Sequence, residues 1–235
     1  MLSASAAGVG GLLHAPSALA AISDESIGPG KWNPDTDSPR FTLAVMPDTR
    51  FLYFAPSIMP EPRLASFRYI VYRANGGSDN IVFMAHLGDL TEDGTVAEFG
   101  PVSQVFSYLD QRGAAYSVLA GKHDVRSSTN DQRGDAPYLL AMGPQRFGNS
   151  KSLVAADPTG YNTAHVFRAG GRQWLVLALD WRLPAAGFAW ANGVIRQYPA
   201  LPVILTTHEL AGPTYDDTVY PYQSGDAPRP AAKPR

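Results

Sequence analysis

Residues 80–90 read NIVFMAHLGDL, an apolar run that ends at a glycine and an aspartate. A short apolar run bounded by turn residues is typical of a buried strand. The segments on either side have apolar residues at helical spacing instead of in a continuous run. Residues 61–74 (EPRLASFRYIVYRA) repeat apolar side chains at helical spacing, and residues 95–113 (TVAEFGPVSQVFSYLDQRG) predict a second helix that ends at its final glycine. We therefore expect a buried strand between two helices.

Two more strands extend this pattern in both directions. Residues 41–46 (FTLAVM) predict a buried strand before the first helix, and residues 115–121 (AYSVLAG) predict a strand after the second. Strands that alternate with helices indicate parallel βαβ units. Ligands of open α/β sheets bind beyond the carboxyl ends of the strands, where several loops meet. Asp48, Asp89 and His123 each follow one of these strands, so we expect them at one edge of the sheet.

The second half of the chain has a different order of elements. Residues 163–169 and 172–181 are apolar segments on either side of a Gly-Gly pair, which suits the turn of a β-hairpin. A helical segment at about 185–197 and a strand within 201–210 (LPVILTTHEL) follow, and the strand ends in polar residues. The expected fold class is α/β, with a mixed, partly parallel β-sheet core flanked by helices.

Composition limits the class of protein. The 235 residues are 45% hydrophobic and 17% charged, which is ordinary for a globular chain with a single core. The net charge of -2 and the pI of about 6.2 argue against nucleic acid as a partner, because contacting its phosphates needs a basic surface. No apolar run reaches the length of about 18 residues that a membrane-spanning helix needs. Because cysteine is absent, any metal ligands must come from His, Asp, Glu or Asn.

The N-terminal stretch MLSASAAGVGGLLHAPSALAA is small and apolar, and its Ala18-Leu19-Ala20 has the form of a signal-peptidase site. The first basic residue is Lys31, so the stretch is either a signal peptide without its basic start or a disordered leader. We expect a secreted or extracytoplasmic protein, while the lack of cysteine leaves a cytoplasmic location open. The expected boundaries are a leader at 1–27, a linker at 28–40, a domain at 41–223 and a disordered tail at 224–235.

A lysine stands directly before a His-Asp pair in residues 118–125, VLAGKHDV. A phosphate-binding P-loop would need a glycine at position 116 and a Ser or Thr at position 123, because its backbone wraps the phosphates and its hydroxyl holds magnesium. Those positions hold Tyr116 and His123. The segment therefore indicates a metal-type site that contains a cation, and not a nucleotide-binding loop.

Four polar segments follow predicted strands in a fixed order: PDTR, GDLTEDG, GKHD and TTHEL. In this order they resemble the signatures of the calcineurin-like metallophosphoesterase superfamily, in particular its secreted bacterial members, over roughly residues 40–210. The resemblance implies a layered α/β sandwich that hydrolyses a small phosphoester with two divalent metal ions, Mn, Fe, Zn or Ca. Two ions about 3.5–4 Å apart can clamp the attacking and leaving oxygens and deprotonate a bound water.

The resemblance also implies a role for each polar residue. Asp89 would bridge the two metal ions, with Asp48 on the first ion and His208 on the second. His123 would lie beside the phosphoryl group without binding a metal, where it stabilises charge or protonates the leaving oxygen. Asp124 would orient the imidazole of His123.

Two residues depart from the family pattern. Arg50 stands where the family has His or Gln, and Lys122 stands where it has a ligating Asn. A guanidinium has no lone pair to donate and an ammonium must first lose its proton, so neither is a metal ligand as it stands. The family's final Gly-His-x-His does not occur in the sequence, which implies a C-terminally incomplete domain without its last strands. Each metal would then keep two ligands, below the usual three of catalytic zinc sites.

These departures support a second hypothesis beside the metal-dependent hydrolase. In it, Arg50 and Lys122 replace the charge of the metals by pairing with Asp89 and Asp48, and the chain is a non-catalytic relative that binds a phosphate or a protein partner. The two cations could also be solvated charges at the rim of the sheet. Further polar residues near the same segments are three spare carboxylates, Asp93, Asp180 and Glu209, and two histidines that we expect to be structural, His86 and His165.

Overall fold

The computed structural model describes residues 31–53, 58–75, 79–125 and 136–209, together with the backbone of 211–212 and 220–221. The expected leader at 1–27 and tail at 224–235 lie outside these residues. Within the described part, no helix is both long enough and apolar enough to cross a membrane.

The first half forms the predicted βαβ units. A three-stranded sheet with the order β1-β2-β3 is parallel throughout, and its strands are β1 (Thr42–Met46), β2 (Ile81–His86) and β3 (Tyr116–Val118). Helix α1 (Glu61–Ala74) joins β1 to β2, and helix α2 (Val96–Arg112) joins β2 to β3. The register aligns Met46, His86 and Val118, so the loops that follow the three strands begin at the same edge.

Local sequence explains where α2 begins and ends. Thr95 and Glu98 form a capping box, in which each side chain accepts a hydrogen bond from the backbone N–H of the other residue. The helix ends at Gly113, whose φ of 66° lies in the left-handed region that favours glycine. The predicted limits of this helix are therefore confirmed.

The second half forms a mixed sheet. Its order is β4-β5-β6-β7, with β4 (Leu153–Ala156), β5 (Thr163–Ala169), β6 (Arg172–Leu179) and β7 (Val203–Thr207). Strands β5 and β6 are the expected hairpin, and both glycines of its turn have positive φ. Strand β7 pairs parallel to β6, because helix α4 (Ala185–Gln197) connects them as a crossover. The shorter elements are a 3-10 helix at Arg50–Tyr53, α3 (Pro137–Met142), a 3-10 helix at Pro144–Gly148, β8 (Ala211–Gly212) and β9 (Tyr220–Pro221).

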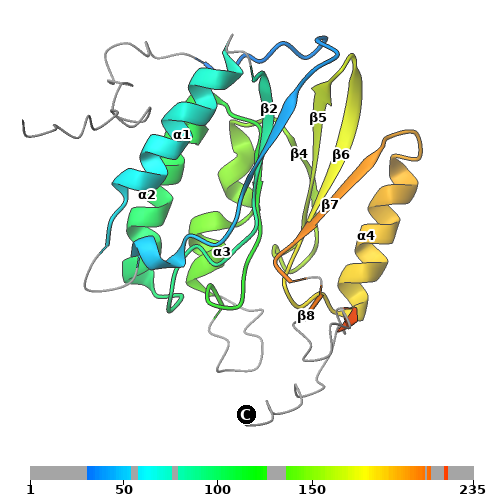
Figure 1. Cartoon of the computed structure of the whole chain (residues 1–235). Coiled ribbons are helices and arrows are strands. Elements are labelled where there is room, and N and C mark those ends of the chain that lie inside the picture. The colour runs from blue at the N-terminus through cyan, green and yellow to red at the C-terminus, as the bar shows by residue number, and fades with distance from the viewer. Residues whose placement is uncertain are drawn as a thin grey trace, which may run out of the picture.

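The two sheets pack face to face between layers of helices (Figure 1), with α1 and α2 on one outer face and α4 on the other. This is the layered α/β arrangement expected from the sequence. The single core expected from composition is instead divided into three hydrophobic clusters, because each sheet separates the side chains on its two faces. In β6, Leu175 and Leu177 point toward α4, whereas Val176 points between the sheets.

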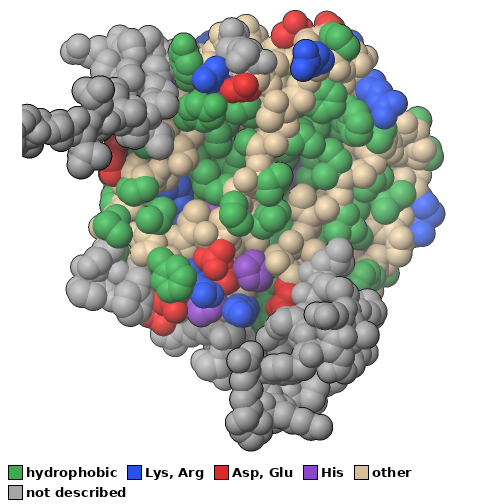
Figure 2. Space-filling model, in the orientation of Figure 1, with side chains coloured by type: hydrophobic (Ala, Val, Ile, Leu, Met, Phe, Trp, Pro, Cys, Tyr) green, Lys and Arg blue, Asp and Glu red, His purple; other side chains and the backbone are tan. Residues whose placement is uncertain are grey.

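Strands β1 and β7 are edge strands, and this changes one prediction. Residues 41–46 were expected to be a buried strand, but in β1 Thr42 and Val45 are exposed and the other residues are only partly buried, because nothing pairs with its outer edge in the described part. Val45 is 58% exposed, and Leu205 and Val203 of β7 are 52% and 39% exposed. Figure 2 shows hydrophobic side chains on the face of the molecule where these two edges lie.

The segment expected to be a linker is partly attached to the domain. The backbone N–H of Trp32 donates to the carbonyl of Arg112, and the backbone N–H of Asp35 donates to the side chain of Asn80. The Asn80 side chain in turn donates to the carbonyls of Asp35 and Arg40. Residues 32–40 are therefore part of the folded unit.

Candidate functional site

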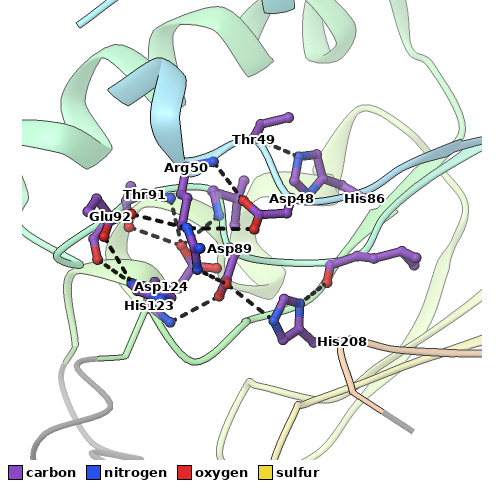
Figure 3. A network of polar contacts seen from close by, with 12 residues as sticks. Asp48, Thr49, Arg50, His86, Asp89, Thr91, Glu92, His123, Asp124 and His208 are labelled. Carbon is purple, nitrogen blue, oxygen red and sulfur yellow. Dashed lines mark hydrogen bonds and ion pairs between the residues drawn. The ribbon is translucent and has the colours of Figure 1, made fainter. Parts of the chain in front are cut away.

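The loops that follow four strands meet at one point (Figure 3). Asp89, which follows β2, accepts a hydrogen bond from Arg50 Nη1 at 3.1 Å and one from the backbone N–H of His123 at 3.0 Å. His208 follows β7, and its Nε2 lies 3.3 Å from Asp89 Oδ2, the same oxygen that accepts from Arg50. Asp48 follows β1 and lies 3.6 Å from Arg50 Nε. The structure thus brings together the side chains predicted to share a site.

Asp89 is the centre of this group. It is 1% exposed and has a φ of 49°, an uncommon conformation for a residue with a side chain. Burial raises the pKa of Asp89, but hydrogen bonds from His208 and from the backbone of His123 outweigh it and hold this pKa below its usual value. The surrounding hydrogen-bond donors therefore favour the ionised form of the Asp89 carboxylate.

Two glycines let the loops approach closely. A Cβ atom at Gly121 would overlap the side chain and backbone N of Asp89, and a Cβ atom at Gly88 would overlap the backbone of Gly121. Gly88 also has a φ of 88°. Glycine is therefore needed in both the Gly-Asp and the Gly-Lys-His-Asp segments, because each glycine makes room for the other loop.

Asp124 has a different role from the one predicted. It is fully buried, and its Oδ1 accepts hydrogen bonds from the backbone N–H groups of Leu90 and Thr91 at 2.9 and 3.0 Å. Its Oδ2 accepts from the backbone N–H of Gly121 at 3.0 Å. Burial raises the pKa of Asp124 to about 7, against the hydrogen bonds from these backbone groups. Asp124 therefore joins the two loops, and both of its oxygens are used by backbone donors.

The ring of His123 is oriented by Glu92 instead. His123 Nδ1 lies 2.7 Å from the carbonyl oxygen of Glu92 and 3.7 Å from its carboxylate. The expected pairing with Asp124 is replaced because the Asp124 carboxylate faces the backbone of the neighbouring loop. Glu92 lies in the GDLTEDG segment, but nothing in its spacing distinguished it from the neighbouring acids.

Arg50 lies among three carboxylates. Its Nε is 3.6 Å from Asp48 and 3.2 Å from Glu92, and its Nη1 is 3.1 Å from Asp89. The backbone N–H of Arg50 also donates to Asp48 Oδ1 at 3.0 Å. The predicted pairing of Arg50 with Asp48 and Asp89 is confirmed. Lys122, for which the same pairing was considered, forms no ion pair with any residue of the described part.

His208 is held at both ring nitrogens. Its Nδ1 lies 2.8 Å from the carbonyl oxygen of Leu87, to which it donates, and its Nε2 faces Asp89. Burial lowers the pKa of His208, but the Asp89 carboxylate more than offsets this and raises the pKa above its usual value. The protonated imidazole is therefore favoured, and His208 adds a second positive group beside Asp89.

A buried arginine lies behind the site and was not foreseen. Arg63 of α1 is 1% exposed, stacks at 4.3 Å over the ring of Tyr53 and donates to the carbonyl of Leu90 at 3.2 Å. Burial lowers its pKa to about 10. His86, expected to be structural, is fully buried and bonded to Thr49 at 3.1 Å. Its pKa lies well below the usual value because of burial and the nearby Arg63. Only the tertiary structure shows that Arg63 is buried behind the site, because the sequence of α1 is that of an ordinary helix.

The residues do not fit a two-metal centre as they stand. Among the described residues, no group of three or more His, Asp or Glu side chains is arranged to hold a metal ion. The guanidinium of Arg50 contacts the carboxylates of Asp48 and Asp89 that would serve as ligands. A dication about 4 Å from this cation would be repelled by roughly 8 kcal/mol at an effective dielectric constant of about 20, before screening by solvent.

Comparison with known proteins adds one distant similarity. The chain is 26% identical over 170 residues to the uncharacterized protein YvnB of Bacillus subtilis (strain 168). The match covers 72% of this chain but 13% of that protein, so the chain spans a small part of its relative's length. No protein-family model matches the chain.

Proposed function

We propose that the site binds a phosphate or phosphoester group without metal ions, as a non-catalytic relative of metal-dependent phosphoesterases would. The observation that carries this proposal is the position of Arg50, whose guanidinium lies in contact with the carboxylates of Asp48, Asp89 and Glu92. A site that supplies its own positive charge has no need of a metal to hold its carboxylates together.

The exposure of two of the three carboxylates supports an exchange with an incoming anion. Asp48 is 37% exposed and Glu92 is 22% exposed, so their bonds to Arg50 are each worth roughly 0–1 kcal/mol. Asp89 is 1% exposed and keeps its place. A phosphate can displace the two outer carboxylates, because guanidinium binds phosphate oxygens in a bidentate manner. Protonated His208 adds a positive charge beside Asp89, while its two ring nitrogens stay bonded to Leu87 and Asp89.

The metal-dependent phosphoester hydrolase is the second candidate. The observation that favours it is the convergence of Asp48, Asp89 and His208 from three separate strand ends. This function would require Arg50 to leave its present contacts. Bound divalent ions would supply an activated water, and the resemblance of the four loop segments is its main support.

One experiment separates the two candidates. The purified chain is assayed for bound Mn, Fe, Zn and Ca, then for hydrolysis of 4-nitrophenyl phosphate and bis(4-nitrophenyl) phosphate with and without added metal. Binding of inorganic phosphate is measured by calorimetry on the same sample. We expect no bound metal, no turnover and phosphate binding that is lost in Arg50→Gln but kept in Arg196→Gln, a surface control at the end of α4. Two metals per chain together with turnover would exclude the metal-free site.

The double variant Arg50→His, Lys122→Asn gives a complementary test. It removes both cations and introduces two side chains that can bind metal. We expect this variant to bind divalent metal more tightly than the wild type. An unchanged metal content would mean that these two positions do not account for the lack of a metal centre.

We also propose that the protein is exported, on the basis of its small, apolar N-terminal stretch. Expression of the full chain in a bacterial host, followed by N-terminal sequencing of the extracytoplasmic fraction, tests this. Cleavage after Ala20 supports export, whereas an intact chain confined to the cytoplasm contradicts it.

A further inference from the structure

We propose that the phosphate ligand of the candidate site carries an aromatic ring joined directly to its phosphate, as in an aryl phosphomonoester. The inference rests on the proposed function and names the ligand class of the same site. It starts from Phe51, which directly follows Arg50 and is 67% exposed. Isolated apolar residues are common on protein surfaces, but Phe51 adjoins the cation that would bind the phosphate.

The position of Phe51 relative to the site is fixed by its neighbours. It lies in the 3-10 helix Arg50–Tyr53, and Tyr53 at the end of this helix is fully buried. Before the helix, the backbone N–H of Thr49 donates to the carbonyl of Asp89 at 3.0 Å. The chain is thus attached on both sides of Phe51, and a defined backbone segment presents its ring at the surface.

The ring of Phe51 lies next to the group that would bind the phosphate. The Cζ atom of Arg50 is 4.7 Å from the centroid of this ring, within the limit of about 6 Å for a cation–π contact. Phosphate oxygens bind at the N–H groups around the edge of a guanidinium. A group joined directly to a phosphate on Arg50 therefore comes within reach of the Phe51 ring.

A second exposed apolar side chain belongs to a residue beside the same helix. Met59 is 50% exposed, and its backbone N–H donates to the carbonyl of Leu52 at 2.6 Å. A thioether forms favourable contacts with aromatic rings. Figure 2 shows hydrophobic side chains next to the charged and histidine side chains that gather on this face. The margin of the site is therefore apolar on this side, whereas Arg50 and its carboxylate partners make the centre polar.

These features favour an aryl ester over other phosphates. Aromatic rings pair most favourably with their centroids about 4.5–7 Å apart, in edge-to-face or offset arrangements. A ring on the ester oxygen can adopt such a distance from Phe51, because Arg50 holds the phosphate beside that ring. In a nucleotide a ribose separates the base from the phosphate, so the base would lie farther from Arg50 than Phe51 does. An alkyl phosphate forms no ring pair at all.

The test is calorimetry of the full chain, without added metal, with inorganic phosphate, methyl phosphate, phenyl phosphate and adenosine 5′-monophosphate. At a pH of about 8 the esters are dianionic, because their second pKa is about 6, so they differ chiefly in the organic group. We expect phenyl phosphate to bind roughly 3- to 10-fold more tightly than methyl phosphate, which is the range that one aromatic pair supplies.

Phe51→Ala removes the ring, and the exposure of this side chain means that the fold is kept. The ratio of the affinities for phenyl and methyl phosphate should fall by at least about threefold in this variant. The ratio is the readout because loss of the contact with Arg50 acts on both ligands alike. Tyr72→Ala is the matched control, since Tyr72 is a 46% exposed aromatic residue in the last turn of α1, which leads to the opposite end of β2. Its ratio should equal that of the wild type.

The outcomes separate this inference from the proposed function. Equal affinities of the wild type for phenyl and methyl phosphate, or an unchanged ratio in Phe51→Ala, would overturn the inference and leave the phosphate site standing. Tighter binding of adenosine 5′-monophosphate than of phenyl phosphate would overturn the choice of an aryl ester. A wild type that does not bind inorganic phosphate would overturn the proposed function, and this inference with it.

Discussion

Replacing Arg50 by glutamine tests whether an internal cation holds the strand-end loops together. The variant removes the ion pair of 3.1 Å between the guanidinium and Asp89, which is 1% exposed. Breaking a buried ion pair costs about 3–5 kcal/mol. Asp89 keeps its bonds from His208 and the backbone of His123, which lowers the expected cost to about 2–3 kcal/mol. The more exposed Asp48 and Glu92 add at most about 1 kcal/mol each.

The loss is measurable by thermal and urea unfolding. For a chain of 235 residues, each kcal/mol shifts the melting temperature by about 2–4 °C. The total of about 2–5 kcal/mol therefore predicts that Arg50→Gln melts roughly 4–20 °C below the wild type. The control is Arg68→Gln, whose partner Glu61 is 69% exposed, and we expect it to melt within about 4 °C of the wild type.

A divalent metal should restore the stability of Arg50→Gln. Without the guanidinium, the carboxylates of Asp48 and Glu92 lose their cation, and His208 remains as the cation beside Asp89. Mn²⁺ at about 100 times its dissociation constant would stabilise the variant by about 2.7 kcal/mol. The wild type, in which Arg50 occupies these contacts, should gain little.

Two outcomes would refute this reasoning. An Arg50→Gln variant that is no less stable than Arg68→Gln would mean that the guanidinium does not hold the loops. Equal stabilisation of wild type and variant by Mn²⁺ would mean that Arg50 does not compete with metal, and the metal-dependent hydrolase would become the better candidate.

Three further predictions concern the loops and the sheet edge. Asp89 raises the pKa of His208 in the folded state, so the pair stabilises the protein fully below pH 6.5 and less as the pH rises through the higher folded pKa. The difference in urea stability between the wild type and His208→Gln should therefore be larger at pH 6 than at pH 9. Gly121→Ala should lower the free energy of unfolding by more than about 2 kcal/mol, because its Cβ overlaps Asp89. The control Gly193→Ala within α4 should raise it by about 0.5–1 kcal/mol, and equal effects of the two variants in thermal unfolding would contradict this account. Leu205→Lys on β7 should reduce self-association in gel filtration, and a wild type that elutes as a sharp monomer at high concentration would contradict it.

Much of the fold could be predicted because its signals are local. Apolar residues run without a break through β2 and recur at helical spacing in its flanking helices, and the capping residues Thr95 and Gly113 mark the limits of α2. The Gly-Gly turn predicted the β5-β6 hairpin. The exposure of β1 could not be predicted, because whether an apolar strand lies at the edge of a sheet depends on pairings with distant residues.

The candidate site was predicted in its members but not in its contacts. Aspartate and histidine residues at strand ends share an edge because parallel strands in register end together, which the sequence order alone implies. The use of both Asp124 oxygens by backbone donors depends on how two loops fold against each other. The same holds for Glu92 as the partner of His123.

By itself, the sequence determined the order of strands and helices, the strand-end location of Asp48, Asp89, His123 and His208, and the presence of cations among these acidic and imidazole side chains. These follow from periodicity and residue chemistry, which act over short stretches of chain. Only the tertiary structure decided that Arg50 lies among three carboxylates while Lys122 makes no ion pair with the described residues. The reason is that an ion pair depends on distances of a few ångströms between loops that are far apart in the chain.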